Sequence, residues 1–262
     1  MTPLPPVSRA RRAVLSLAMC AGLALSTTAC GAEKKEDPDK GTNGVGKLSA
    51  TEIEGKARAA AAAAASVRLS GTLVSKGGTY KLNMRLKDDG GTGSVTSKHN
   101  TFALLRIDDA LYLKADAKFW TQKDAGGEGG ASGPSETDAE AALKLGNKYV
   151  KVPQGDPAYK QFRGFTEMDV LLNGLLGMEG ELSKGDRTQV GGVRVIKVRA
   201  ADGAGGVLDV SLEGEPYPLQ FARGGGAGVL TLGEWGLDFA LTPPAEEETV
   251  DYGGQLPKTS GG

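Results

Sequence analysis

The residue with the clearest chemistry is Cys30, a thiol that stands between an apolar stretch and a charged one. Three arginines within residues 9–12 form a basic region, and residues 13–25 form an apolar run too short for a permanent transmembrane anchor. Small residues at 26–29 lead into the cysteine. This order is typical of a bacterial lipobox, in which the thiol is alkylated with diacylglycerol and cleavage leaves the cysteine as the new N-terminus.

The lipobox pattern has one departure and leaves alternatives open. Thr27 stands where leucine is usual, and a plain secreted protein with a free thiol is the alternative to lipidation. The pair Arg11-Arg12 also resembles a twin-arginine signal, so Sec and twin-arginine export both remain open. Cys20 lies in the apolar run and is removed with the signal, so the processed chain must be stabilised by its core without a disulfide.

Residue types that perform catalysis are sparse. The single histidine, His99, is interpreted as an exposed strand residue, and a serine–histidine–aspartate triad would have to use it. The segment "GASGP" fails the G-x-S-x-G pattern at its last position, and "GGGAG" at 224–228 is interpreted as a hairpin turn. The aspartate pairs at 88–89 and 108–109 are interpreted as turn residues. One histidine and one lipidated cysteine cannot form a metal cluster, so the sequence predicts a protein that is not an enzyme and has no metal or cofactor.

Composition and charge argue against a nucleic-acid partner. Residues 1–29 contain three arginines and no acids, so their removal leaves 28 basic and 32 acidic residues, a formal charge of −4. No basic stripe remains. Glycine is frequent, at 40 of 262 residues, while aromatics make up 5%, and this balance indicates many turns and therefore many strands.

The elements that must position any site begin after a polar segment. Residues 30–47 are rich in charge, glycine and lysine, and they are predicted to be a lipidated cysteine followed by a flexible tether. Ser49 and Glu52 have the spacing of a capping box. The alanine-rich run that follows predicts a helix ending near Ser66, narrow enough to lie close against a sheet.

Alternation of apolar and polar residues predicts strands joined by tight turns. Every second residue is apolar, or glycine at 71, in 67–73 and 80–86, with "KGG" between them, which indicates a hairpin. Helices are expected at 135–145 and in "TEMDVLLNGLLGM" with Thr166 as its cap. Further strands are expected at 93–98 and in "TFALLRI", "ALYLKA", "KYVKV", "TQVGGVRVIKVRA", "GVLDVSL", "YPLQFAR", "GVLTL" and "LDFALT". These elements predict an α+β fold with one antiparallel sheet of about eleven strands and three helices, followed by a polar tail at 245–262.

The order of these segments resembles that of the LppX/LprG-type lipoproteins of the actinobacterial cell envelope, which share a LolA-like fold. The landmarks are Cys30 with its tether, the alanine-rich helix leading into "SVRLSGTL", "LLRIDDALYLKAD" with Asp109 where glycine is common, "KFW", "NKYVKVP" and "VLTLGEWGLDFALTPP". The resemblance covers residues 48–244. It implies a strongly curved antiparallel sheet, a half-barrel, with helices across its concave face. Some members hold acyl chains of lipids or lipoglycans in a hydrophobic cavity there, and others have small cavities or no known ligand.

A dry apolar groove is the kind of binding site that this chain can offer, because acyl chains need a lining with few polar groups. A small-residue helix and a glycine-rich sheet fill volume poorly, which favours such a groove. The same apolar residues would equally form an ordinary packed core. The candidate lining residues are Leu69, Leu73, Tyr80, Leu82, Met84, Leu105, Ile107, Leu111, Leu113, Leu171, Leu172, Leu175 and Leu176.

These observations predict a lipoprotein on the outer face of the cytoplasmic membrane, held there by diacylglyceryl-Cys30. It is expected to bind a lipid, lipoglycan or other amphiphile in the groove and to carry or present it. The alternative is an envelope interaction module that docks a protein partner and has no lipid cargo. A continuous cavity on the order of several hundred Å³ favours the first, and a filled core with an exposed apolar patch favours the second.

Overall fold

The computed structural model describes residues 38–75, 78–121 and 136–251. The signal peptide at 1–29, the lipidation site Cys30, the first part of the tether and the end of the polar tail lie outside these residues, and so does Ser135, the expected start of a helix. Residues from Pro38 onward form one compact unit, which is the part described below.

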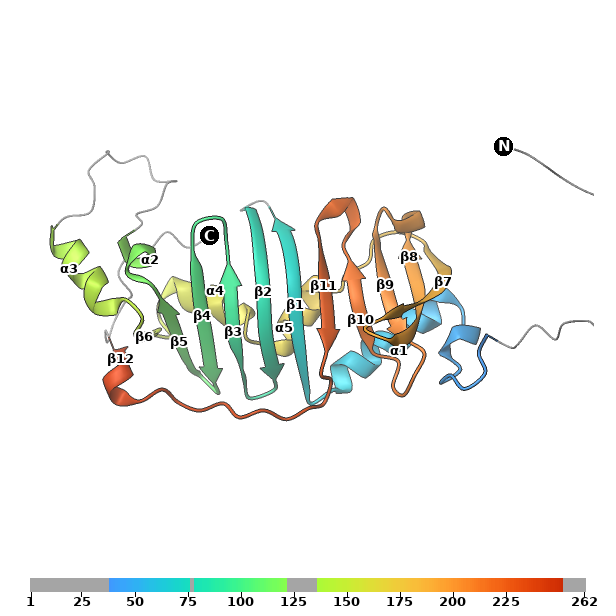
Figure 1. Ribbon diagram of the computed structural model, residues 1–262, viewed down its shortest axis with the longest axis horizontal. Helices are drawn as coiled ribbons and strands as arrows, with labels where there is room; N and C mark the ends of the chain where they lie inside the picture. Colours follow the sequence, from blue (N-terminus) through green and yellow to red (C-terminus); the bar gives the residue numbers. More distant parts are fainter. Residues whose placement is uncertain (1–37, 76–77, 122–135, 252–262) are drawn as a thin grey trace, which may run out of the picture. The chain divides into compact units, whose positions relative to one another are not determined.

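Twelve strands of the described chain form one curved sheet in the order β12-β6-β5-β4-β3-β2-β1-β11-β10-β9-β8-β7 (Figure 1). All neighbours are antiparallel except β12, which lies parallel to β6. The predicted α+β fold with a single, mostly antiparallel curved sheet is confirmed. The strands are β1 (Ser66–Ser75), β2 (Gly78–Lys87), β3 (Gly90–Thr96), β4 (Thr101–Ile107), β5 (Ala110–Ala115), β6 (Tyr149–Lys151), β7 (Leu182–Val190), β8 (Val193–Ala200), β9 (Gly206–Ser211), β10 (Pro218–Ala222), β11 (Gly228–Gly233) and β12 (Thr249–Asp251).

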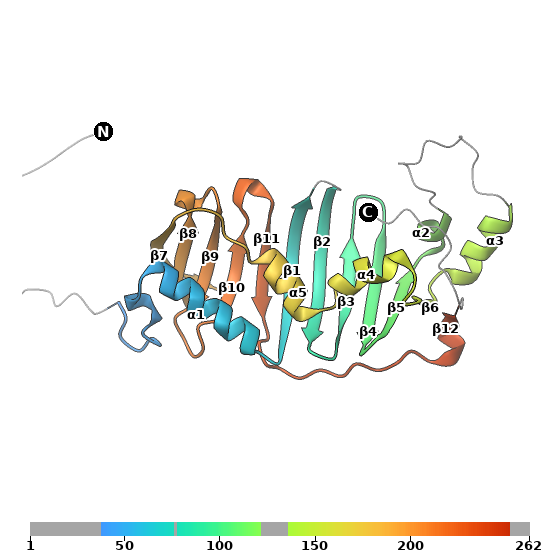
Figure 2. The ribbon, with the colours of Figure 1, turned by 180° about the vertical axis from the view of Figure 1, so that it is seen from behind.

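Helices cover one face of the sheet, here called the inner face. Figure 2 shows α1, α5 and α4 following one another across it. The helices of the described chain are α1 (Ala50–Ala63), α2 (Ala117–Thr121), α3 (Glu136–Leu145), α4 (Pro157–Gly164) and α5 (Met168–Leu175), with single 3-10 turns η1 (Val45–Lys47), η2 (Ala201–Gly203), η3 (Gly224–Gly226) and η4 (Glu246–Glu248).

The capping box predicted for α1 is confirmed. Ser49 Oγ accepts a hydrogen bond from the backbone N–H of Glu52, and the Glu52 carboxylate accepts one from the backbone N–H of Ser49 at 2.9 Å. Two of the N–H groups that a helix leaves unpaired at its start are thereby satisfied. Ile53, Ala57 and Ala61 form the buried side of the helix.

Three helical predictions need correction. The short helix α2 was not expected, and neither was α4, although Asp156 caps α4 by accepting from the N–H of Ala158 at 2.8 Å and Pro157 occupies its first turn. The predicted cap of α5, Thr166, is wrong, because Glu167 holds the cap position and makes no side-chain capping bond. The Thr166 hydroxyl instead donates to the carbonyl oxygen of Arg163 at 2.9 Å.

The chain after β11 also differs from the prediction. Residues 237–242, "LDFALT", form no strand; the chain turns at Glu234, whose φ is +51°, and runs past the ends of the strands (Figure 1). The expected polar tail then contributes β12, which pairs with β6 through Val250 and Val150. His99, expected in a strand, lies exposed in the turn between β3 and β4.

The first described residues pack on the sheet, whereas the sequence placed everything before residue 48 in a free tether. The amide of Asn43 donates to the carbonyl oxygens of Ser211 and Gly214 at 3.1 and 3.0 Å. Arg187 binds the carboxylate of Asp39 at 2.8 Å. The folded unit therefore begins about ten residues earlier than the predicted boundary.

Candidate functional site

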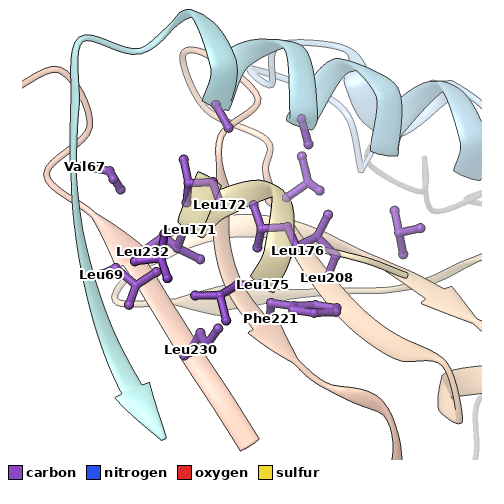
Figure 3. Close-up of a cluster of buried hydrophobic side chains, with 14 of the residues drawn as sticks. Val67, Leu69, Leu171, Leu172, Leu175, Leu176, Leu208, Phe221, Leu230 and Leu232 are labelled. Atoms are coloured by element: carbon purple, nitrogen blue, oxygen red, sulfur yellow. The ribbon is translucent and has the colours of Figure 1, made fainter. Parts of the chain in front are cut away.

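The helix α5 presses a layer of leucines against the centre of the inner face. Leu171, Leu172, Leu175 and Leu176 are all buried in a cluster that also contains side chains of α1 and of the sheet. Figure 3 shows them gathered beside Leu69, Leu230 and Leu232 of β1 and β11, and beside Leu208 and Phe221 of β9 and β10. A ligand bound between α5 and the sheet would have to lie at this place.

Most of the predicted groove residues lie in two buried clusters. The cluster beneath α1 and α5, here the central cluster, includes Leu69, Leu82, Met84, Leu171, Leu172, Leu175 and Leu176, with Leu73 and Tyr80 packed against it. The cluster of β4–β6 with α2, α3 and α4, here the lateral cluster, includes Leu111 and Leu113. The described side chains at these positions fill the space between helices and sheet in the present state.

Leu105 and Ile107 lie outside both clusters. Leu105 pairs with Thr92 of β3 and Tyr112 of β5, and Thr92 pairs with the exposed Arg85. Directly opposed residues share a face of an antiparallel sheet, so Leu105 and Ile107 belong to the outer face. Their neighbour Leu104 takes the inner position that the sequence assigned to them.

Arg106 explains that error and is the main site feature that sequence reasoning missed. The pattern "TFALLRI" allows either alternation, and the alternation that buries Leu105 keeps the arginine in solvent. The structure does the opposite, since Arg106 pairs with Gly91 and Leu111 on the inner face and is 4% exposed.

The guanidinium of Arg106 is held by carbonyl oxygens. Its Nη1 donates to Asp108 at 2.8 Å, and its Nη2 donates to Thr166 at 3.1 Å. Its Nε is buried and has no hydrogen-bond partner within the described residues. A Cβ on Gly91 would lie 3.0 Å from the Thr166 carbonyl oxygen, so the glycine permits the link between α4 and α5 to approach the sheet here.

Two positions at the centre of the inner face are glycines and carry no side chain. Gly71 stands in register with Leu82, and Gly93 stands in register with Met84. Their φ values are +146° and +157°, and an added Cβ would meet backbone oxygens of the neighbouring strands at 2.1 and 2.2 Å. No larger residue fits without moving the backbone, so this region is filled by neighbouring side chains, among them Met84 of β2, whose sulfur would lie 2.7 Å from a Cβ on Gly93, and the leucines of α5.

Aromatic rings join the two clusters. Phe102 of β4 packs against both of them. Its ring centroid lies 5.6 Å from that of Phe119 and 5.5 Å from that of Phe162. Phe165, in the link between α4 and α5, also contacts both clusters. The apolar layer therefore continues from α1 past α5 to α4.

A small pocket near the end of β11 has a different character. It measures about 140 Å³ and is lined by Val67, Arg68, Arg85, Glu234, Leu237, Asp238 and Phe239. Arg68 and Arg85 bind Glu234 at 2.8 and 2.9 Å, and these contacts, led by the Arg68 hydrogen bond, lower the pKa of the Glu234 carboxyl. The pocket is smaller than the roughly 300–1,000 Å³ typical of ligand sites, and its ion pairs do not suit an acyl chain.

The described residues offer little for catalysis. They contain no group of three or more His, Cys, Asp or Glu side chains placed to hold a metal ion. His99 is exposed in its turn, and the aspartates at 88–89 and 108–109 lie in the turns predicted for them. Within the same residues, no helix is long and apolar enough to cross a membrane.

Comparisons with known proteins give a likeness in structure alone. No family model matches the chain, and no curated protein matches it. Similar solved structures include LprF from Mycobacterium bovis, with 14% identity over 75% of this chain and 97% of that chain and a TM-score of 0.48. The lipoprotein LppX of Mycobacterium tuberculosis has 10% identity over 74% and 98%, with a TM-score of 0.41. An uncharacterized conserved protein from Thermus thermophilus has 11% identity over 77% and 98%, with a TM-score of 0.35.

LprF and LppX are lipoproteins of the LppX/LprG type, the type that the sequence resembles. At these identities and TM-scores the likeness says nothing about a ligand. What this chain binds has to follow from its own residues.

Proposed function

We propose that this chain is a lipid-anchored protein of the cell envelope that binds a lipid or other amphiphile between α5 and the inner face of the sheet. The observation that carries the proposal is the layer of four buried leucines that α5 lays over the centre of the sheet, where Gly71 and Gly93 contribute no side chain. Aliphatic side chains and acyl chains are chemically alike, so a chain that displaced these leucines would meet the same apolar lining.

The attachment of α5 suits such an exchange. The helix has only eight residues and no side-chain cap, and helices of this length are not stable on their own in water. Its start is linked to the sheet by the bond from Arg106 to Thr166, and its end is linked to α1 by a bond of 3.2 Å from Arg58 Nη2 to the carbonyl oxygen of Leu176. Gly177 follows directly, and a Cβ there would meet no atom within 4 Å.

The apolar surface buried when a lipid binds offsets the cost of lifting α5 from the sheet. Lifting α5 exposes its leucines and the strand residues beneath them, which costs about 25 cal/mol for each Å² of apolar area. A bound acyl chain covers the same strand residues and removes its own surface from water, so the loss is offset. The mechanism is partition: the chains leave water while the head group stays at the mouth of the site.

The location follows from Cys30 and the segments around it. We propose that diacylglyceryl-Cys30 holds the protein at the outer face of the cytoplasmic membrane, on a tether that ends near Pro38, where the compact unit begins. A membrane-bound carrier would remain close to the lipids that it takes up or presents. The chain acts without catalysis in this proposal.

An interaction module that docks a protein partner is the second candidate. It is favoured by the filled state of the two clusters and by Val74 and Val229, which are 42% and 45% exposed and lie near each other on β1 and β11. Exposed valines on adjacent strands offer a small apolar contact surface. In this alternative α5 is a permanent part of the core.

Native mass spectrometry with lipid extraction separates the two candidates. The unit from Pro38 onward is exported in an envelope-bearing host behind a cleavable signal, because this unit contains the whole described core. We expect a co-purifying lipid. Leu172→Trp should remove it by filling the space beneath α5, and Leu143→Trp, at a position on α3 that is 72% exposed, should retain it.

Lipid carriage would be refuted by a clean apo mass across several hosts. That result would favour the interaction module. Circular dichroism of both variants must match the unchanged protein for the comparison to hold.

A further inference from the structure

A positive charge lies inside the apolar layer without an acidic partner. Arg106 is 4% exposed, and within the described part of the chain it forms no salt bridge. Burying a charge is costly unless it is paired and fully hydrogen-bonded. Two carbonyl oxygens accept from Nη1 and Nη2, while Nε has no partner among the described residues. A group with this cost points to a ligand that offsets it.

The acids beside Arg106 are already engaged by another arginine. Arg163 binds Glu167 at 2.5 Å and lies 3.6 Å from the carboxylate of Asp109. Glu167 is the cap residue of α5, and because its side chain is turned to Arg163, it caps no N–H of the helix. Asp109 and Glu167 are therefore paired with Arg163 and do not neutralise the charge of Arg106.

The start of α5 adds a second attraction for negative charge at the same place. The carbonyl that accepts from Arg106 Nη2 belongs to Thr166, two residues before Met168, where the helix begins. The first N–H groups of a helix have no partners within it and carry the positive end of its dipole. No side-chain hydrogen bond caps them, and the acid of the first turn, Asp169, is exposed to solvent, so they suit an anion held against the guanidinium.

The unpaired Nε donor lies on the same edge of the guanidinium as Nη2. Nε and Nη2 form the side of the fork that grips two oxygens of a carboxylate or phosphate. Nη2 is occupied by the Thr166 carbonyl oxygen, which belongs to the link that must move if α5 lifts. Movement of α5 would release Nη2 beside the free Nε and leave a bidentate site at the border of the central and lateral clusters.

We propose that Arg106 binds the anionic head group, a phosphodiester or carboxylate, of an amphiphile whose acyl chains take the place of the α5 leucines. This inference rests on the proposed lipid binding and narrows its ligand to anionic lipids. The guanidinium gives the head group a fixed position, and the chains extend from it along the inner face beneath α5.

The test compares two lipids that differ in charge and share their acyl chains. The unit from Pro38 onward is titrated with phosphatidylglycerol and with diacylglycerol, and bound lipid is counted by native mass spectrometry. We expect phosphatidylglycerol to bind about ten- to a hundredfold more tightly, the range given by one charged hydrogen-bonded contact. Arg106→Met should reduce its affinity to that of diacylglycerol, whose own binding stays unchanged. Arg68→Met, an exposed arginine on the outer face, is the matched control and should keep the preference.

Each other outcome overturns a defined part of the proposal. Equal binding of the two lipids to the unchanged protein would remove the head-group role and leave lipid binding standing, and this result needs no variant to fold. Absence of binding to either lipid would overturn lipid binding together with the inference. Inorganic phosphate that binds as tightly as phosphatidylglycerol would assign the site to free phosphate and refute a lipid head group.

Discussion

The two helices whose side chains enter the central cluster are attached to the inner face in different ways. The longer helix, α1, has a capping box and lies against β7–β10 through Ile53, Ala57 and Ala61. The shorter helix, α5, has no side-chain cap and reaches the sheet through leucines. Alanine allows a helix backbone to lie close to a sheet, and its side chain leaves no volume that a ligand could take. Leucine holds the backbone farther away, and its side chains fill the space between helix and sheet. In the proposed function, α1 is therefore fixed structure and α5 is the cover that a ligand displaces.

The largest expected difference concerns the free energy of unfolding. Ile53→Ala in α1 should lower it by about 2–5 kcal/mol, because a fully buried side chain is replaced by a cavity in a part that unfolds with the whole domain. Leu172→Ala in α5 should lower it by less than half as much, because the proposed exchange requires α5 to part from the sheet before the domain unfolds. Urea denaturation followed by circular dichroism gives both values.

Hydrogen exchange on the unchanged protein is the control for this comparison. Amides of 168–175 should exchange through local opening, well before those of 50–63. Equal losses in the two variants, with equal protection of the two helices, would mean that α5 is as firmly part of the core as α1.

A smaller difference is expected at the helix starts. Ser49→Ala should cost about 1 kcal/mol of stability, since it removes the bond to the Glu52 N–H and breaks the capping box. Glu167→Gln, at the cap of α5, should cost less than about 0.5 kcal/mol, because that side chain caps nothing and only its pair with Arg163 is weakened. Thermal unfolding of the two variants measures both, and a larger loss for Glu167→Gln would contradict the contrast.

The sequence predicted well those features whose causes lie within a few residues. The capping box of Ser49 and Glu52 and the turns at 88–89 and 108–109 depend on local spacing, and the structure has them where they were expected. The helix α4 could have been found in the same way, since Asp156 followed by Pro157 is a helix-start signal.

The features that escaped prediction depend on contacts far apart in the chain. Three residues of β12 carry no recognisable strand pattern, and they pair with β6 about a hundred residues earlier in the chain. The inner position of Leu104 requires Arg106 to be buried, and one of the two carbonyl oxygens that accept from the buried guanidinium belongs to Thr166, sixty residues away. Whether the leucines of α5 fill the groove is a matter of summed side-chain volumes, which a hydrophobic pattern does not contain.

The smallest effect is expected on the outer face, where a change should leave both helices untouched. The carboxylate of Glu234 is bound by Arg68 and Arg85, chiefly through the Arg68 hydrogen bond, and its pKa is lowered. A lowered folded-state pKa stabilises the protein above the unfolded value of about 4.3, and the contribution is lost as the pH falls through the folded-state pKa. Glu234→Gln should therefore be slightly less stable than the unchanged protein at pH 7. This difference in stability should disappear in acid and decrease at high salt, because all three side chains are exposed.

Lipid binding and the hydrogen-exchange rates of 168–175 should not change in this variant, since the substitution lies on the face of the sheet opposite α5. A change in lipid affinity or in these exchange rates would show that the outer face is coupled to α5. The strands of the sheet would then have to be counted with α5 as part of the structure that responds to a ligand.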